Sequence, residues 1–228
     1  MMIMINEIFK SVSGEAGHPY FPQGTFCAFI RFQGCNLRCE WPCDTVCSQE
    51  YGIGGMYMRT ADIIQAVDGS RNVMITGGEP LLQRTELVHL VNALRGIGKQ
   101  IQIETNGTYA PPDFGPAVTW VIDYKLPSSG MEFAMMKKED FISALATGRA
   151  VIKFVYDDDA DIERAISRIK VFTCVDKAKW SLNFAPFILS PTINGRAFSK
   201  KLMEKIYAEN LQDYCIFSLQ SHTILDLK

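Results

Sequence analysis

Short apolar runs rich in β-branched and aromatic residues recur along the whole chain, separated by segments in which apolar residues follow a helical spacing. Such runs are typical of strands buried on both faces, and the segments between them are typical of amphipathic helices. We predict a first strand at the N-terminus and further strands over 27–34, 73–78, 101–107, 120–126, 150–157, 181–190 and 215–220. Helices are predicted over 85–98, 138–148, 161–172 and 198–211.

Strands that alternate with helices predict the α/β class with a mostly parallel sheet. Because no low-complexity tract or long linker interrupts the chain, we expect a single domain over residues 1–228. Ligands of such folds bind at the carboxyl ends of the strands. Polar motifs follow three predicted strands, at 76–80, 104–107 and 123–125, so we expect one site at that edge of the sheet.

Composition and charge narrow the classes of function. A hydrophobic content of 47% with 21% charged residues is typical of a globular protein. The net charge of −2 lacks the basic surplus of a protein that coats nucleic acid. No apolar run approaches the roughly 18 residues that cross a bilayer, and the N-terminus lacks a basic region and a cleavage site. We therefore expect a cytoplasmic protein that binds neither nucleic acid nor membranes.

The strongest chemical signal is a cluster of cysteines directly after a predicted strand. Four of the seven cysteines fall within 13 residues: Cys35, Cys39, Cys43 and Cys47. Pro42 disfavours a continuous helix there, so we expect a compact loop over 34–47 around a metal. Three thiolates on such a loop suit a [4Fe–4S] cluster with one open iron. A zinc ion held by all four thiolates and buried thiols without a metal are the alternatives.

The Gly-Gly-Glu sequence at 77–79 is a second candidate. Adjacent glycines allow a ligand to approach the backbone closely, and the carboxylate of Glu79 can accept hydrogen bonds from an ammonium group. A plain Gly-Gly turn that ends a strand is the alternative interpretation.

Together these segments resemble the 7-carboxy-7-deazaguanine synthase family of the radical S-adenosylmethionine superfamily. The resemblance spans most of the chain and includes INEIFKSVSGEAG, FIRFQGC, GCNLRC, CDT, TGGEPLLQ, IETNGT and SLQSH. It implies a compact or partial (β/α) barrel and a carbon–nitrogen lyase of queuosine and 7-deazapurine biosynthesis. The implied reaction converts 6-carboxy-5,6,7,8-tetrahydropterin to 7-carboxy-7-deazaguanine with loss of ammonia. The implied cofactors are a [4Fe–4S] cluster, S-adenosylmethionine and Mg²⁺, and the implied partners are a flavodoxin or ferredoxin and a second copy of the chain.

The resemblance also assigns site residues by their places in these motifs, with no catalytic side chain beyond the bound cofactors. The cluster ligands are Cys35, Cys39 and Cys43, where Cys43 is preferred to Cys47 because it opens Cys-Asp-Thr, and Thr45 binds Mg²⁺. The cofactor-binding residues are Trp41, Asp44, Gly78, Glu79, Asp123, Tyr124 and Lys125. The substrate-binding residues are Val12, Ser13, Gly14, Glu15, Arg31 and Thr76.

The sequence departs from the family pattern at three places. Three residues separate each pair of cluster cysteines, where the family has three and then two, so Cys47 competes as a ligand. Ser13 stands where many members carry glutamine, and Asp123 replaces a serine. Two alternatives therefore stay open: a related radical enzyme acting on a finished deazapurine such as queuine, and a zinc-stabilised binding module that is not an enzyme.

Arg31 carries the most specific expectation about the substrate. It shares a strand face with Phe29 and Gln33, since residues i and i+2 of a strand point the same way. A buried guanidinium needs an anionic partner. We predict that this partner is the substrate carboxylate, with an internal ion pair, for example to Glu15, as the alternative.

Overall fold

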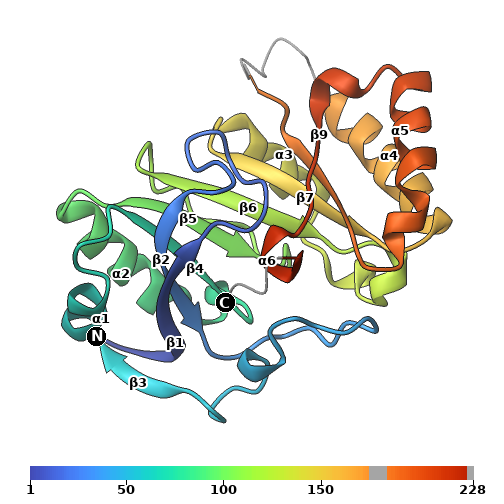
Figure 1. Cartoon of the computed structure of the whole chain (residues 1–228). Coiled ribbons are helices and arrows are strands. Elements are labelled where there is room, and N and C mark those ends of the chain that lie inside the picture. Colours follow the sequence, from blue (N-terminus) through green and yellow to red (C-terminus); the bar gives the residue numbers. More distant parts are fainter. Residues whose placement is uncertain (175–183, 225–228) are drawn as a thin grey trace.

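The computed structural model describes residues 1–174 and 184–224, without the side chains of residues 222 and 223. Its strands form one sheet in the order β3-β1-β2-β4-β5-β6-β7-β8-β9 (Figure 1). The strands are β1 (Met2–Val12), β2 (Phe26–Phe32), β3 (Met56–Arg59), β4 (Asn72–Gly77), β5 (Gln100–Thr105), β6 (Val118–Tyr124), β7 (Ala150–Tyr156), β8 (Phe187–Pro191) and β9 (Cys215–Phe217). Neighbours from β2 to β9 are parallel, and β1 is antiparallel to both β2 and β3. The predicted α/β class with a mostly parallel sheet is confirmed.

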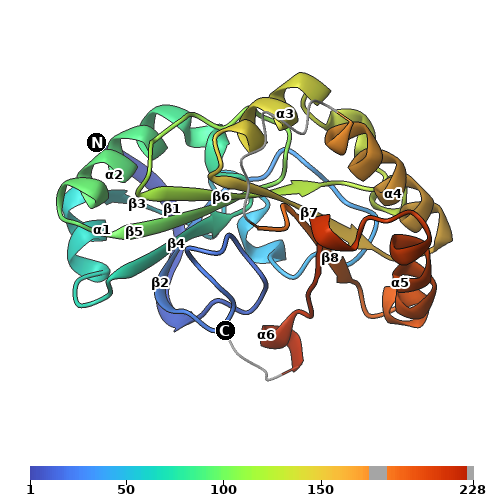
Figure 2. The same cartoon turned by 90° about the horizontal axis from the view of Figure 1, so that it is seen from above.

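Helices line one side of the curved sheet, as the view from above shows for α2, α3, α4 and α5 (Figure 2). The α-helices are α1 (Thr60–Ala66), α2 (Arg84–Gly96), α3 (Lys138–Ala146), α4 (Asp159–Thr173), α5 (Ser199–Ala208) and α6 (Ser221–Ile224). Short 3-10 helices cover Val46–Ser48, Pro80–Gln83, Pro127–Ser129, Glu132–Ala134, Gly195–Phe198 and Gln212–Tyr214.

The four predicted helices correspond to α2, α3, α4 and α5. In α2 the spacing of apolar residues fixes the buried face, because Leu87, Leu90, Val91 and Leu94 are all fully buried against the sheet. The main core therefore lies between the helices and the outer face of the sheet.

Two elements differ from the sequence-based expectation. The strand predicted over 181–190 begins only at β8, after Pro186, which has no amide hydrogen to donate to a sheet. Residues 181–183 of that prediction lie outside the described residues. The edge strand β3 was not predicted, because it has only four residues and three of them are exposed, so it carries no alternating pattern.

The sheet forms an open, partial barrel, as predicted, with β3 and β9 at its edges. The loop after β1 spans the opening and bonds to the segment after β9. The amide N–H of Ser221 donates to the carbonyl of Gly14 at 2.8 Å, and that of Ala16 donates to Ser218 Oγ at 2.9 Å. The N-terminal INEIFKSVSGEAG segment and the late SLQSH segment are thus neighbours in space.

The same loop fills part of the inner face of the sheet. Phe21 packs with Cys27 and Met74, and Ala16 packs against a second apolar cluster on β6, β7 and β8. Polar side chains nearer the carboxyl ends of these strands therefore lie next to a packed apolar layer on the inner face of the sheet.

His18, in this loop, is fully buried. Its Nε2 lies 3.1 Å from the carbonyl of Gly148, and its Nδ1 accepts from the amide of Tyr20 at 3.3 Å, which defines a neutral ring protonated on Nε2. Burial lowers the pKa of His18 to about 4, an effect that the bond to Gly148 only partly opposes.

We expect acid to destabilise the protein through His18. Below the ordinary pKa of 6.5 His18 binds a proton in the unfolded chain, whereas in the folded chain it stays neutral until about pH 4. The contribution of neutral His18 to the free energy of unfolding is therefore fully present above pH 6.5 and is lost as the pH falls. Relative to His18→Phe, the free energy of unfolding should drop by up to about 3 kcal/mol between pH 7 and pH 4. Urea unfolding of both proteins across this range measures the difference, and parallel pH curves would contradict the assignment.

Candidate functional site

Five polar side chains project from the inner face of consecutive strands, near their carboxyl ends. They are Arg31 on β2, Thr76 on β4, Glu104 on β5, Asp123 on β6 and Lys153 on β7, and we call them the polar row. Arg31 pairs in register with Thr76, and Asp123 with Lys153. Thr76 Oγ1 donates to Glu104 Oε2 at 2.9 Å. Parallel pairing thus brings together residues that lie up to 122 positions apart in the sequence.

Four charged side chains form a continuous line, which we call the ion chain. Lys153 Nζ lies 2.7 Å from Glu15 Oε2 and 3.2 Å from Asp123 Oδ1, and Lys125 Nζ lies 2.9 Å from Asp123 Oδ2. Burial alone would lower the pKa of Lys153, but Asp123, Glu15 and Glu104 outweigh it and raise that pKa well above its usual value. Burial likewise opposes ionisation of Asp123, yet Lys125 and Lys153 hold the pKa of Asp123 below its usual value. Lys153, Asp123 and Lys125 are therefore charged near neutral pH.

Arg31 has an anionic partner within the protein, and it is not the expected one. Its Nε lies 3.0 Å from Glu7 Oε1, whereas Glu15 pairs with Lys153. Glu7 lies directly opposite Arg31 in the antiparallel pairing of β1 with β2, which the sequence did not reveal. The alternative of an internal ion pair is therefore present in the structure, with Glu7 in place of the example Glu15. A guanidinium bound through Nε still carries two terminal nitrogens with which to bind a second anion.

Glu79 is completely buried and accepts several hydrogen bonds from the chain itself. Its carboxylate accepts from the amide of Leu81 at 2.8 Å, from Thr105 Oγ1 at 2.9 Å and from the amide of Asn106 at 2.7 Å. Burial raises the pKa of Glu79 to about 7 although these bonds oppose the rise. The bond to Asn106 also ends β5 two residues before the predicted end. Glu79 thus joins the TGGEP and ETNG motifs, and its contact with a cofactor stays a prediction.

Asn106 connects this motif pair to the cysteine loop. Its Nδ2 donates to Asn36 Oδ1 at 2.8 Å and lies 3.8 Å from Cys35 Sγ. The loop itself is anchored by backbone bonds from Gly34 to Ser48 and from Cys35 to Gln49, both 2.8 Å. The sequence did not single out Asn106, although its position in ETNG was visible.

Two of the four clustered cysteines, Cys35 and Cys39, lie near Lys125, and Cys39 also lies near Cys43. Burial raises the pKa of Cys39, the charge of Lys125 opposes this rise, and the neighbouring thiols of Cys43 and Cys35 add to it. Cys47 is exposed, and its Sγ lies 3.6 Å from Asn6 Oδ1. The surroundings of Cys35 and Cys39 thus differ from those of Cys47, and the choice of Cys35, Cys39 and Cys43 as the donor set stays a prediction.

This donor set fits a cluster. Within the described ranges, no three His, Cys, Asp or Glu side chains lie close enough together to hold a single metal ion. The thiolates of an iron–sulfur cluster bind different iron atoms, so they stand farther apart than the ligands of a single ion. A neighbouring cation such as Lys125 also favours the thiolate form that binds iron. Thr45 Oγ1 lies 3.4 Å from Cys43 Sγ, at the rim of the same loop.

The other predicted residues divide into two groups. Ser13 is buried and, with Val12 and Gly14, shapes the turn that presents Glu15: its Oγ donates to the carbonyl of Glu15 at 3.2 Å. Trp41 and Asp44 lie on the cysteine loop, half-buried and exposed respectively.

The structure does not bring the side chain of Tyr124 to this site. It points into the helix-side core, where its hydroxyl donates to Glu132 Oε1 at 3.0 Å. Gly78 packs on Gly34: a Cβ on Gly78 would lie 2.2 Å from the carbonyl oxygen of Gly34. The tight approach at this glycine is thus to the protein's own backbone, as the Gly-Gly turn interpretation held.

Lys153 is the main residue that the sequence analysis missed. A lone lysine within the apolar run AVIKFVYD was its only signal.

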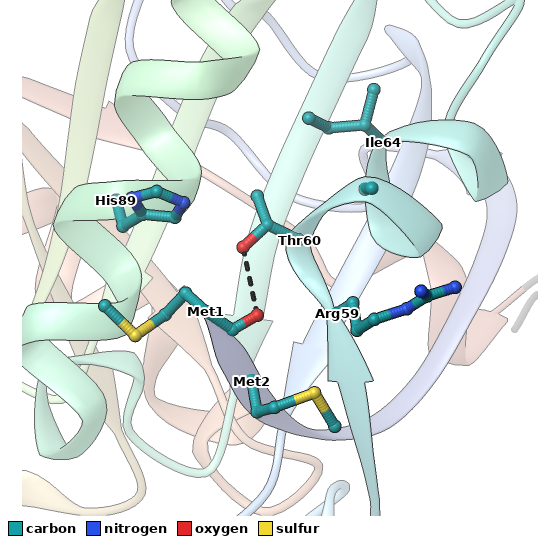
Figure 3. Close-up of a pocket in the computed structure, with 7 residues that line it drawn as sticks. Met1, Met2, Arg59, Thr60, Ile64 and His89 are labelled. Atoms are coloured by element: carbon teal, nitrogen blue, oxygen red, sulfur yellow. Dashed lines mark hydrogen bonds between the residues drawn. The ribbon is translucent and has the colours of Figure 1, made fainter.

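A cavity of about 610 Å³ lies elsewhere, between the start of β1, α1 and α2. Met1, Met2, Arg59, Thr60, Ile64 and His89 line it together with Ala61, and Thr60 Oγ1 donates to the carbonyl of Met1 (Figure 3). It shares no residue with the polar row, the ion chain or the cysteine loop. Across the described part of the chain, no helix has the length and apolar character to cross a membrane.

Comparisons with known proteins place these residues in a family. Residues 23–110 match the family described as 4Fe-4S single cluster domain. The 7-carboxy-7-deazaguanine synthase of Clostridium acetobutylicum is 32% identical, over 99% of this chain and 96% of that protein. Those of Methanospirillum hungatei and Koribacter versatilis are 39% and 38% identical, over 71% and 72% of this chain and 64% and 69% of their own lengths. The crystal structure of QueE from Escherichia coli superposes with a TM-score of 0.73 at 25% identity, covering 97% of this chain and 95% of that one.

Proposed function

The chain belongs to the 7-carboxy-7-deazaguanine synthase family, and we propose that it converts 6-carboxy-5,6,7,8-tetrahydropterin to 7-carboxy-7-deazaguanine with loss of ammonia. The observation that carries this proposal is the cysteine loop over 34–47, in which Cys35 and Cys39 lie near Lys125. It occurs in a chain that aligns over nearly its full length with the enzyme of Clostridium acetobutylicum. The family evidence favours this activity over a queuine lyase and over a zinc-stabilised binding module.

Cys35, Cys39 and Cys43 would hold a [4Fe–4S] cluster and leave one iron open. With S-adenosylmethionine bound, that cluster supplies the radical chemistry that removes a hydrogen atom from the substrate. Lys125, which lies beside Cys39 and is 13% exposed, would pair with the carboxylate of S-adenosylmethionine. The backbone around Gly78, together with Trp41, Asp44 and Tyr124, completes the proposed cofactor contacts, where Tyr124 can contribute only its backbone.

The polar row and the loop after β1 would hold the substrate. Arg31 offers its terminal nitrogens to the pterin carboxylate, whose planar geometry suits a guanidinium. Glu15 accepts from the N–H donors on the aminopyrimidine edge of the pterin, because an ionised carboxylate has only acceptors. Thr76, already bonded to Glu104, borders the space between these two groups.

We also propose that Thr45 binds Mg²⁺, since hydroxyl oxygen is a hard ligand of the kind this ion prefers. Thr45→Val keeps the shape of the side chain and removes the oxygen. We expect the variant to load iron normally and to lose most of the stimulation that added Mg²⁺ gives to the wild type. Rates measured against Mg²⁺ concentration test this, with Thr147→Val, remote from the site, as the matched control. An equal Mg²⁺ response in wild type and Thr45→Val would remove Thr45 from the metal site.

The remaining proposals concern the protein as a whole. We propose a single domain over residues 1–228 that acts in the cytoplasm as a homodimer and receives one electron at a time from a flavodoxin or ferredoxin. Free cysteines at every described position fit a reducing compartment.

The test of the function is an anaerobic assay of the iron-loaded protein with S-adenosylmethionine, a reductant and the carboxytetrahydropterin, read by mass spectrometry. We expect 7-carboxy-7-deazaguanine to form, and no turnover in a parallel reaction with queuine. A protein that cleaves S-adenosylmethionine but leaves the pterin unchanged would contradict the proposed substrate.

A further inference from the structure

We propose that Lys153 is a positioning residue through which the substrate and S-adenosylmethionine strengthen each other's binding. The inference rests on the proposed function, because it takes Glu15 as a substrate contact and Lys125 as a cofactor contact. Lys153 lies between them in the ion chain and touches neither ligand in this assignment.

Lys153 and Asp123 together link the two contacts. Its Nζ is 2.7 Å from Glu15 and 3.2 Å from Asp123, and the other oxygen of Asp123 is 2.9 Å from Lys125 Nζ. The Lys153 residue is 7% exposed, so little water screens these charges. Glu15 is held in place by Gln220, whose Nε2 donates to its second oxygen at 3.1 Å.

Lys153 is shared by Glu15 and Asp123, and Asp123 is shared by Lys153 and Lys125. A ligand that binds at one end of the ion chain therefore changes the pairing at the other end. In the state described, Lys125 is bound by Asp123, which competes with a cofactor carboxylate for the charge of Lys125. When substrate N–H groups occupy Glu15, that carboxylate attracts Lys153 less, and Lys153 pairs more strongly with Asp123. Asp123 then holds Lys125 less tightly, and Lys125 becomes available to the cofactor. The same steps run in reverse, as thermodynamic linkage requires.

A purely structural role makes a different prediction. Lys153 neutralises two largely buried carboxylates, so its removal would destabilise the fold in either case. A structural role would lower stability and weaken both ligands independently. Only a coupling role makes the effect of one ligand on the other disappear.

The experiment measures this coupling directly by calorimetry. The cluster-loaded protein is kept anaerobic and without reductant, so that no turnover occurs. The Kd of S-adenosylmethionine is measured with and without saturating 6-carboxy-5,6,7,8-tetrahydropterin, and the Kd of the pterin with and without S-adenosylmethionine. In the wild type we expect each ligand to lower the Kd of the other at least about fivefold, by the same factor.

Two variants break the link at different points. In Lys153→Gln and in Asp123→Ser we expect the ratio of the two Kd values to fall below about twofold. Asp123→Ser restores the residue of the family pattern and keeps the proposal testable if Lys153→Gln fails to fold. Lys99→Gln is the matched control and should keep the wild-type ratio. Lys99 is a partly buried lysine that donates to the backbone carbonyls of Val67 and Ser70, away from the ion chain.

The outcomes separate the two proposals. A wild-type ratio near one in a protein that forms 7-carboxy-7-deazaguanine would overturn the coupling and leave the function intact. Full coupling in Asp123→Ser, or its loss in Lys99→Gln, would also overturn it. A pterin that neither binds nor reacts would refute the proposed function and the coupling with it.

Discussion

Single replacement of Cys35, Cys39 or Cys43 by alanine is expected to abolish iron loading and activity, whereas Cys47→Ala is expected to keep both near the wild-type level. The reason is spatial. Cys39 lies near Cys35, Cys43 and Lys125, while Cys47 is exposed and contacts Asn6. A cluster that leaves one iron open for a ligand needs three thiolates, so the loss of any one removes a ligand that no neighbour replaces.

Iron content and absorbance after anaerobic reconstitution measure this result, and Cys47→Ala is the matched control. Because Cys47 is spaced from Cys43 as the other cysteines are from one another, the opposite assignment is a real alternative. Iron retained in Cys43→Ala and lost in Cys47→Ala would make Cys47 the third ligand.

Arg31→Lys is expected to preserve fold, cluster and cleavage of S-adenosylmethionine but to weaken substrate binding about 10- to 100-fold. An ammonium group cannot reproduce a planar bidentate contact, and the loss of one hydrogen bond to a charged group costs about 1.5–3 kcal/mol. The Nε of Arg31 is already engaged by Glu7 at 3.0 Å, so the substrate would depend on the terminal nitrogens that lysine lacks.

The measurements are the Kd of the carboxytetrahydropterin and the amount of 5′-deoxyadenosine formed without product. Arg59→Lys is the matched control, since Arg59 is exposed and pairs with Asp62 away from the site. If Arg31→Lys binds the pterin with the wild-type Kd, Arg31 does not bind the substrate. Its role would then be the ion pair with Glu7 that joins β1 and β2.

The sequence predicted the architecture because its information is local. Most buried strands are short runs rich in apolar residues, and the longer helices, α2 for example, carry an apolar stripe. Parallel strands place their carboxyl ends at one edge of the sheet, so motifs at the ends of successive strands were expected to lie close together. The polar row contains four such residues, Arg31, Thr76, Glu104 and Asp123. The spacing of the cysteines predicted a metal loop, but on its own left open how many of the four thiols converge.

Only the tertiary structure decided how these side chains pair. Glu15 and Lys153 are 138 positions apart, and no local pattern connects them. Arg31 binds Glu7 rather than Glu15 because the register of β1 against β2 places Glu7 opposite it. The face of the sheet to which each side chain points was equally decisive. Tyr124 and Lys125 are adjacent, yet the ring of Tyr124 enters the helix-side core while the amine of Lys125 joins the ion chain. Charges in a folded protein choose partners by proximity and burial, and both arise only when distant segments pack together.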